Sequence, residues 1–166
     1  MPTHHRNAPS HWRTTGVATS LAVAGALALG GVAAAAPGVP GTTGSPQEPS
    51  PCQTAVKACV QLSTHQAWLT DGAGTVLLGP VAMNDGASAT PTPTGMFTVQ
   101  WKDRDHRSRE FNNAPMPFAV FFDTNGRAFH AGDPARQSAG CVRLDPAIAE
   151  QFFNALQPSD RVQILP

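Results

Sequence analysis

The chain has 166 residues, enough for one domain of ordinary size or two small ones. Its 11 basic and 11 acidic side chains give a formal charge of zero. This balance excludes a general nucleic-acid binder, which needs a basic surplus against phosphate. Apolar residues make up 41% of the chain and supply a core, whereas charged residues reach only 13%, about half the usual share. The three cysteines are an odd number, so a disulfide framework leaves at least one of them unpaired.

The first 35 residues have the composition of a secretory signal peptide. Arg6 and Arg13 are the only charged side chains there, an apolar centre covers 21–29, and alanines end the segment. The centre is shorter than the ~20 residues needed to span a bilayer, and we predict cleavage near Ala35 and export to an extracytoplasmic location. With its weakly apolar flanks the segment reaches spanning length, so an uncleaved membrane anchor is the alternative. Cleavage leaves nine basic and 11 acidic groups, a net charge of −2.

Residues 36–51 are predicted to form a flexible linker. They contain five prolines, no aromatic residue and one charged side chain. Such a segment cannot bury enough apolar surface to offset its chain entropy. The folded domain is therefore predicted to cover residues 52–166.

Short apolar runs separated by turn residues predict β-strands in this domain. The expected strands are 57–62, 66–69, 75–82, 96–101, 118–122, 127–130 and 161–165. Asn125-Gly126 is the strongest hairpin signal in the chain. Trp68 and Trp101 are predicted as core residues, and the charged run 102–110 as a solvated loop.

One helix is predicted at about residues 146–157. Asp145 can cap its N-terminus, Pro146 suits the first helical position, and apolar residues recur every four residues from Ile148. Pro158 ends it. The pattern as a whole predicts a mainly β fold, small and mostly antiparallel, with one packed helix in a single domain.

Sequence position and an oxidising compartment separate the three cysteines into one pair and one single residue. Cys52 and Cys59 are seven positions apart, and in a secreted chain such a pair predicts a disulfide. Zinc binding is the alternative, but no second pair of Cys or His has ligand spacing, so no metal site is predicted. Cys141 then remains a free thiol.

Cys141 lies 11 residues after His130, which ends a predicted strand. A thiol is mostly protonated at neutral pH, and an imidazole within hydrogen-bond reach activates it by taking its proton. Gly140 leaves the backbone amides beside the thiol open to an incoming carbonyl. The alternative is a buried structural cysteine and an unrelated surface histidine. The order His then Cys does not fit papain-like peptidases, and the spacing does not fit sortases.

The motif around this thiol extends in both directions. The chain has His130 and then Ser-Ala-Gly-Cys-Val-Arg over 138–143, preceded by Gly86, Thr94-Gly95-Met96-Phe97 and Met116-Pro117-Phe118. Over residues 57–166 it resembles the YkuD-type L,D-transpeptidase catalytic domain, in particular secreted actinobacterial members. The signature of that family is a His followed by Ser/Thr-His-Gly-Cys-x-Arg. The resemblance implies a β-sandwich or barrel-like fold and no cofactor.

The resemblance also implies a reaction on peptidoglycan stem peptides. Cys141 would attack the carbonyl of the third residue of a tetrapeptide, and D-Ala would leave. An amine of another stem would then resolve the thioester into a 3→3 cross-link. His130 would be general base and acid, the backbone carbonyl of Ala131 would orient it, and the amides of Gly140 and Cys141 would bind the oxyanion.

Further roles follow from the same resemblance. Ser138, Arg143 and Phe118 would contact substrate. For Arg143, support of the active-site turn is the alternative. Phe118 would take the place of a pocket tyrosine, because the chain has no tyrosine. The charged run 102–110 would lie where the family has a lid, so that Arg104 or Arg107 could meet stem carboxylates. Acylation by carbapenems, a cell-wall location and a monomer are also implied.

One departure from the family motif is Ala139, which stands where most members have a histidine. This departure motivates one alternative, a catalytically impaired wall-binding homologue. An L,D-carboxypeptidase, in which water replaces the acceptor amine, would use the same residues and is a second alternative.

Overall fold

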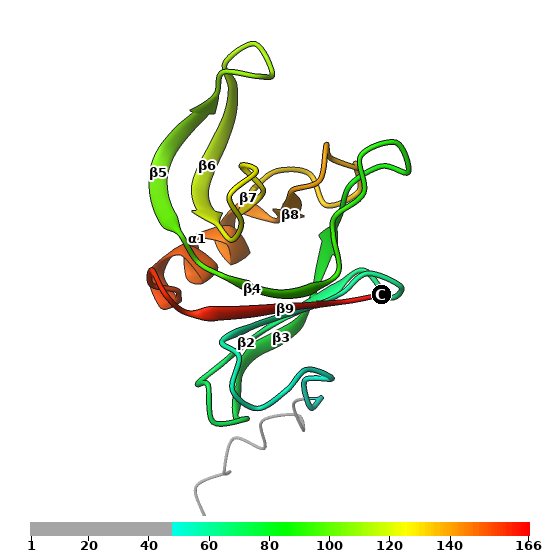
Figure 1. Cartoon of the computed structure of the whole chain (residues 1–166), viewed down its shortest axis with the longest axis vertical. Helices are drawn as coiled ribbons and strands as arrows, with labels where there is room; N and C mark the ends of the chain where they lie inside the picture. Colours follow the sequence, from blue (N-terminus) through cyan, green and yellow to red (C-terminus); the bar gives the residue numbers. More distant parts are fainter. Residues whose placement is uncertain (1–47) are drawn as a thin grey trace, which may run out of the picture. The chain divides into compact units, whose positions relative to one another are not determined.

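The structure is a computed structural model that describes residues 48–166. The predicted signal peptide (1–35) and most of the predicted linker (36–51) lie outside these residues. Nine strands and one helix are present in the part described (Figure 1). Their bounds are β1 (Ala58–Gln61), β2 (Gln66–Thr70), β3 (Val76–Asn84), β4 (Gly95–Thr98), β5 (Trp101–Ser108), β6 (Ala114–Phe121), β7 (Ala128–Ala131), β8 (Val142–Leu144), α1 (Pro146–Ala155) and β9 (Arg161–Leu165). Within 48–166, no helix has both the length and the apolar character of a membrane span.

All nine strands belong to one sheet, in the order β4-β9-β1-β2-β3-β8-β7-β6-β5. Its pairs are antiparallel except β1 with β9 and β7 with β8. The sheet must curl, because its two edge strands β4 and β5 are joined by only Val99 and Gln100, a link of roughly 10 Å. Figure 1 shows this curl. The predicted mainly β, barrel-like fold with one helix is confirmed, as a single curled sheet.

Helix α1 closes one side of the curled sheet and packs on β6, β7 and β8. Asp145 accepts a hydrogen bond from the Ala147 amide at 3.0 Å, and Pro146 occupies the first turn, as predicted. Phe152 and Leu156 are fully buried. The helix ends at Ala155, two residues before the predicted end.

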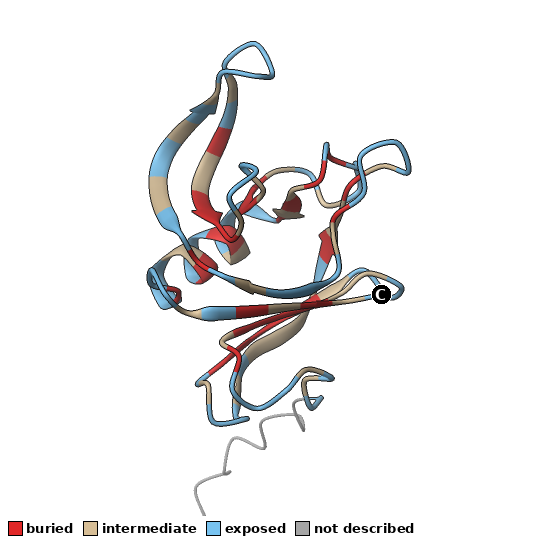
Figure 2. Cartoon of the chain, in the orientation of Figure 1, coloured by how far each residue is buried: buried red, intermediate tan, exposed pale blue. Residues whose placement is uncertain are grey.

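The main core lies between the helix and the inner face of the sheet (Figure 2). Phe129 on β7 is at its centre, with ring centroids 5.2 Å from Phe122 and 5.3 Å from Phe152. All three are fully buried. Removing this apolar area from water is the main stabilising term of the domain, and it holds β7, the strand that ends in His130, in place.

The charged run 102–110 is not a loop, and this prediction was wrong. Most of it forms β5, an edge strand of the sheet. Lys102 donates to the helix carbonyls of Phe153 and Leu156, and Arg104 pairs with Glu150 at 3.3 Å. Charged side chains suit an exposed edge strand because they oppose pairing with other chains. The sequence pattern misses it because these partners lie about fifty positions away.

Trp101 was also predicted wrongly. It begins β5 and its side chain is 44% exposed, whereas Trp68 is buried as predicted. The alternation that put Trp101 on the core side breaks at the link between β4 and β5, where the chain crosses from one sheet edge to the other. Trp101 is therefore outside the core.

The predicted disulfide is present. Cys52 and Cys59 are joined, with Cα atoms 5.7 Å apart. Cys59 is fully buried in β1, between Trp68 of β2 and Gln163 of β9. The bond ties the start of the folded domain to a central strand.

We expect loss of this disulfide to lower the free energy of unfolding by about 2.5 kcal/mol, the chain-entropy value for so short a loop. Chemical denaturation of the Cys52→Ala, Cys59→Ala double variant measures the change. The Cys52→Ala single variant controls for the unpaired Cys59. Unfolding midpoints equal to wild type would contradict the prediction.

Candidate active site

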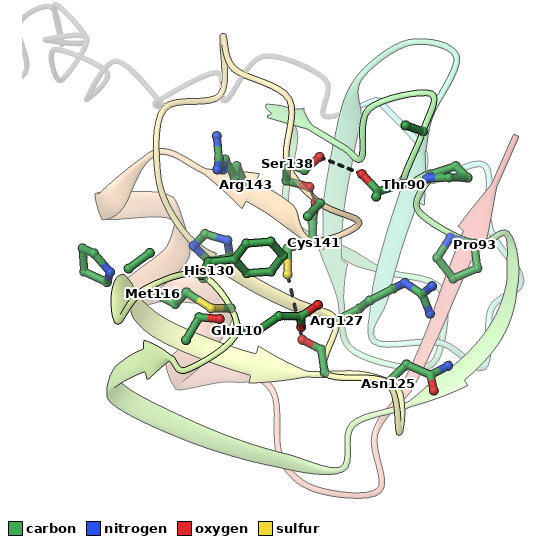
Figure 3. A pocket seen from close by; sticks show the side chains of 18 residues that line it. Thr90, Pro93, Glu110, Met116, Asn125, Arg127, His130, Ser138, Cys141 and Arg143 are labelled. Carbon is green, nitrogen blue, oxygen red and sulfur yellow. Dashed lines mark hydrogen bonds between the residues drawn. The ribbon is translucent and has the colours of Figure 1, made fainter.

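A cleft of about 660 Å³ brings together the residues predicted to carry the chemistry. His130, Ser138, Cys141 and Arg143 all line it, although they come from β7, β8 and the loop between them (Figure 3). The loop between β3 and β4 and the tip of the β5–β6 hairpin supply the other walls. This volume suits a ligand of peptide size.

The parallel pairing of β7 with β8 explains why the histidine and the cysteine meet. Phe129 is in register with Val142 and His130 with Arg143, so Cys141 lies beside Ala128. Side chains two positions apart on a strand point to the same face. His130 and Cys141 therefore project from the same face of the sheet, into the cleft (Figure 3).

The thiol of Cys141 is half-buried. Burial raises its pKa above the ordinary value of a thiol, and this outweighs the lowering by a hydrogen bond with the Ala128 backbone and by the Arg143 cation. The sulfur lies 4.0 Å from the Gly126 carbonyl, to which it donates. The resting nucleophile is therefore the neutral thiol.

His130 has a defined tautomer. Its Nδ1 lies 2.8 Å from the Ala131 carbonyl, which only accepts, so Nδ1 carries the proton and Nε2 has a free lone pair. Burial lowers the pKa of this imidazole, more than the hydrogen bond with Ala131 raises it. The neutral ring is thus ready to take a proton, and its contact with the Ala131 carbonyl fixes its orientation.

The turn before the nucleophile is held by Ser138. Its hydroxyl donates to the Cys141 carbonyl at 2.6 Å and accepts from the Gly140 amide at 3.0 Å. Both findings differ from the sequence prediction. The Gly140 amide is engaged and does not face an oxyanion, and the Ser138 hydroxyl is used within the turn. In the part of the chain described, the amides of Ala139 and Cys141 have no hydrogen-bond acceptor.

Gly140 itself is required by the geometry. Its φ of +107° lies in the region that favours glycine. A Cβ built on it would lie 3.0 Å from Nε of Arg127. The glycine therefore allows the nucleophile turn to pack closely against the side chain of Arg127, the residue before β7.

Sequence reasoning missed the support beneath this turn. Thr92, 3% exposed, donates to the Gly140 carbonyl at 3.0 Å and accepts from the Gly86 amide at 2.9 Å. A Cβ on Gly86 would lie 2.9 Å from the Cα of Gly140. The family resemblance had included Gly86 without a reason, and this close approach supplies it.

Arg143 supports the loop between β7 and β8. Its Nη1 donates to the carbonyls of Gln137 at 3.0 Å and Arg136 at 3.3 Å. This is the turn-supporting role that sequence analysis weighed against a substrate contact. The side chain also lines the cleft, where its positive charge lowers the pKa of both Cys141 and His130.

A second guanidinium, which the sequence did not single out, lies at the nucleophile. Arg127 forms a 2.7 Å ion pair with Asp123, whose other oxygen accepts from the Asn125 and Arg127 amides at 2.9 Å. These bonds shape the Asn125-Gly126 hairpin turn, which was predicted correctly. Arg127 lines the cleft (Figure 3). Its side chain is also the nearest group to a Cβ built on Gly140.

Phe118 does not reach the cleft, contrary to the prediction. Its backbone has a φ of +57°, and its ring packs on Phe153 of the helix with centroids 6.0 Å apart. Arg104 lies over both rings, and Arg107 donates to the Asn113 carbonyl, so neither guanidinium lines the cleft. The hairpin tip does line it, through Glu110 and Phe111.

Ala139 is an exposed residue of the cleft wall. It leaves His130 as the single imidazole among the residues that line this cleft. Within residues 48–166, no three His, Cys, Asp or Glu side chains cluster in a way that would hold a metal ion.

The raised pKa of Cys141 and the lowered pKa of His130 predict the pH dependence of alkylation. Because neither group is charged at rest, the rate of iodoacetamide modification should rise about tenfold per pH unit from about pH 6 to about pH 9. Intact-protein mass spectrometry follows the reaction, with the Cys141→Ala variant as a blank. A plateau below about pH 7 would mean a thiolate–imidazolium pair and would contradict the prediction.

Comparison with known families identifies the family of this domain. The description of the YkuD L,D-transpeptidase catalytic domain matches residues 55–164. This match covers all nine strands except the last residue of β9, and it includes every cleft residue. The chain belongs to the YkuD L,D-transpeptidase catalytic domain family.

Solved structures agree on the fold. An L,D-transpeptidase from Stackebrandtia nassauensis is 24% identical with a TM-score of 0.60 over 66% of this chain and 54% of its own. An L,D-transpeptidase from Mycobacterium tuberculosis H37Rv is 23% identical with a TM-score of 0.60, and the match covers 68% of this chain and 58% of the other. L,D-transpeptidase 3 from Mycobacterium tuberculosis, in complex with a faropenem-derived adduct, is 20% identical with a TM-score of 0.59. This match covers 68% of this chain and 60% of the other. The chain thus spans less than two thirds of each of these structures. Among curated proteins, no match was found.

Proposed function

We propose that this chain is a peptidoglycan L,D-transpeptidase that works through a thioester on Cys141. The observation that carries the proposal is the meeting of Cys141 with an oriented, neutral His130 in one cleft of a domain that belongs to this family. A neutral imidazole beside a neutral thiol is the resting state that general-base activation requires.

In the acylation step, Nε2 of His130 takes the proton of Cys141 as the sulfur attacks the third-residue carbonyl of a tetrapeptide stem. The oxyanion that forms accepts from the Cys141 amide and from that of Ala139, which takes the place predicted for Gly140. The C–N bond then breaks, and His130 returns the proton to the departing D-Ala amine. The product is a neutral thioester with a neutral imidazole.

In the second step, the amine of an acceptor stem attacks the thioester and forms an amide, the 3→3 cross-link. His130 takes a proton from the attacking amine and the thiol is regenerated. Water in place of the amine would release a tripeptide, which is the carboxypeptidase alternative. Ala139 bears on this choice, because it lines the cleft without the second imidazole that most family members have there.

We also propose that the chain acts after export, in the cell wall, and that carbapenems acylate Cys141. The amino-terminal composition supports export. The Cys52–Cys59 disulfide agrees with it, because disulfides persist in oxidising compartments. A β-lactam carbonyl meets the same nucleophile as a stem peptide, and one structural relative carries a faropenem-derived adduct.

The test is incubation of the protein with tetrapeptide muropeptides, followed by chromatography and mass spectrometry. We expect release of D-Ala and a 3→3 dimer, and with a carbapenem an adduct on Cys141. Tripeptide without dimer would assign the carboxypeptidase reaction. No turnover by wild type or by Ala139→His, together with binding to purified wall, would assign the wall-binding alternative.

A further inference from the structure

An aromatic platform on the β5–β6 hairpin lies outside the machinery described above. It consists of Trp101, Phe121 and His106. The Trp101 ring stacks on that of Phe121 with centroids 3.8 Å apart and an interplanar angle of 10°. Phe121 covers one face of the indole, and the residue is still 44% exposed, so its other face is open.

The platform is rigid. His106 stands edge-to-face against both rings, with centroids 5.4 Å from Trp101 and 4.9 Å from Phe121. Asp103 fixes the imidazole through its Nδ1 at 3.1 Å. Phe121 is itself buried in a small apolar cluster that also contacts Cys141. The exposed face of the Trp101 indole is therefore held in one orientation, ready to receive a flat apolar face of a ligand.

A groove of about 700 Å³ runs over the platform. Ser108, Glu110, Met116 and Gly126 line both this groove and the catalytic cleft, so the two adjoin each other on the hairpin. A polymer whose peptide occupies the cleft therefore has the groove next to it, on the side of Trp101.

The polar lining favours an uncharged ligand rich in hydroxyl and amide groups. The charged side chains of the groove balance, with Asp103 and Glu110 against Arg107 and Arg109. Arg109 and Glu110 make no hydrogen bond or ion pair with any residue that the structure describes. Their donors and acceptors are therefore available beside the open face of Trp101.

We propose that this groove is a subsite for the glycan, which binds one or two N-acetylated amino-sugar rings of the strand that carries the stem peptide. The C–H groups on one face of a pyranose ring carry partial positive charge and pack on the negative face of the indole. Hydroxyl and acetamido groups at the ring edge meet Arg109 and Glu110. The inference rests on the proposed function for the identity of the polymer, but its test reads binding alone.

The probe is the peptide-free tetramer of N-acetylglucosamine, titrated into the full chain carrying Cys141→Ala and followed by ¹H–¹⁵N NMR. We expect the indole Nε1–H signal of Trp101 to shift and saturate with a Kd of about 1 mM. The signal of Trp68, which is buried, should stay in place. This measurement needs no change at the platform, and it succeeds or fails whether or not the enzyme turns over.

Two variants localise the site. Trp101→Ala, followed through the backbone amide signals of the other groove residues, should weaken binding by at least about tenfold. Leu77→Ala, which removes another exposed apolar side chain, should not change it. With the wild-type enzyme, a disaccharide-tetrapeptide donor should have a higher kcat/KM than the free tetrapeptide, and in Trp101→Ala this ratio should fall to about one. Failure of the tetramer to shift the Trp101 signal would overturn the proposal. A shift produced by free stem peptide and not by the tetramer would overturn it as well.

Discussion

Replacing Cys141 by Ala lowers the rate of donor acylation by at least about 10⁴-fold, because the reaction then has no nucleophile and only substrate binding and oxyanion stabilisation remain. The side chain is small and partly buried, so the fold should be kept. Single-turnover assays with a tetrapeptide muropeptide, read by D-Ala release and by mass, measure the loss.

The controls separate chemistry from folding. Cys141→Ser keeps the shape of the side chain but has a much less acidic hydroxyl, and we expect a loss of similar size. Leu77→Ala, at an exposed site on β3 outside the cleft, should keep wild-type activity. Wild-type turnover by Cys141→Ala would mean that another group is the nucleophile and would refute the proposed function.

Replacing His130 by Asn is the second large effect, a loss of about 10²–10⁴-fold in the acylation rate. The Asn amide can still donate to the Ala131 carbonyl in place of Nδ1, but it offers no base in place of Nε2. The residual rate should rise steadily with pH up to about pH 9, because solvent must then deprotonate a thiol whose pKa burial has raised. A merely structural role for His130 would lower the rate equally at every pH.

His65→Asn is the matched control for this variant. His65 lies in the turn between β1 and β2 with a φ of +50°, a conformation that Asn accepts well. Its side chain is 56% exposed and outside the cleft. Activity within about twofold of wild type is expected. Retention of full activity by His130→Asn would remove His130 from the mechanism.

The pKa shifts of Cys141 and His130 keep both groups of the active site uncharged at rest. Burial favours the neutral form of both groups, so Cys141 is held as a thiol and His130 as a free base. The thiolate then forms only as the imidazole takes the proton during attack. Such a site resists adventitious oxidation, which needs the thiolate, in the oxidising compartment predicted for this protein.

Local signals in the sequence account well for the elements that pack on the core. Phe152 and the Asp145 cap predicted the helix because both act within a few positions of the chain. The Asn125-Gly126 turn followed from its local conformational preference. Strand β5 could not be predicted from local signals, because its charged residues form their hydrogen bonds and ion pair with residues in and just after helix α1, some fifty positions later.

The candidate active site was likewise predicted only in part. The spacing of His130 and Cys141 suggested the pair, and the Ser-Ala-Gly-Cys-Val-Arg motif carried the resemblance to the family. The orienting carbonyl of Ala131 was implied by that resemblance alone. The hydrogen bonds that occupy Ser138 and the Gly140 amide, and the turn of Phe118 onto the helix, could not be read from a motif, since they depend on backbone conformation.

What the sequence determined by itself was therefore the residue types and their order: one free cysteine after one histidine, a disulfide pair, a mainly β domain and an export-like amino terminus. Only the tertiary structure decided which groups meet. The parallel pairing of β7 with β8 aims His130 and Cys141 into one cleft, Thr92 and Arg127 brace the nucleophile turn, and Trp101 is left in an open groove. The physical reason is that hydrogen bonds and burial act between atoms close in space, and the curl of the sheet sets those neighbours.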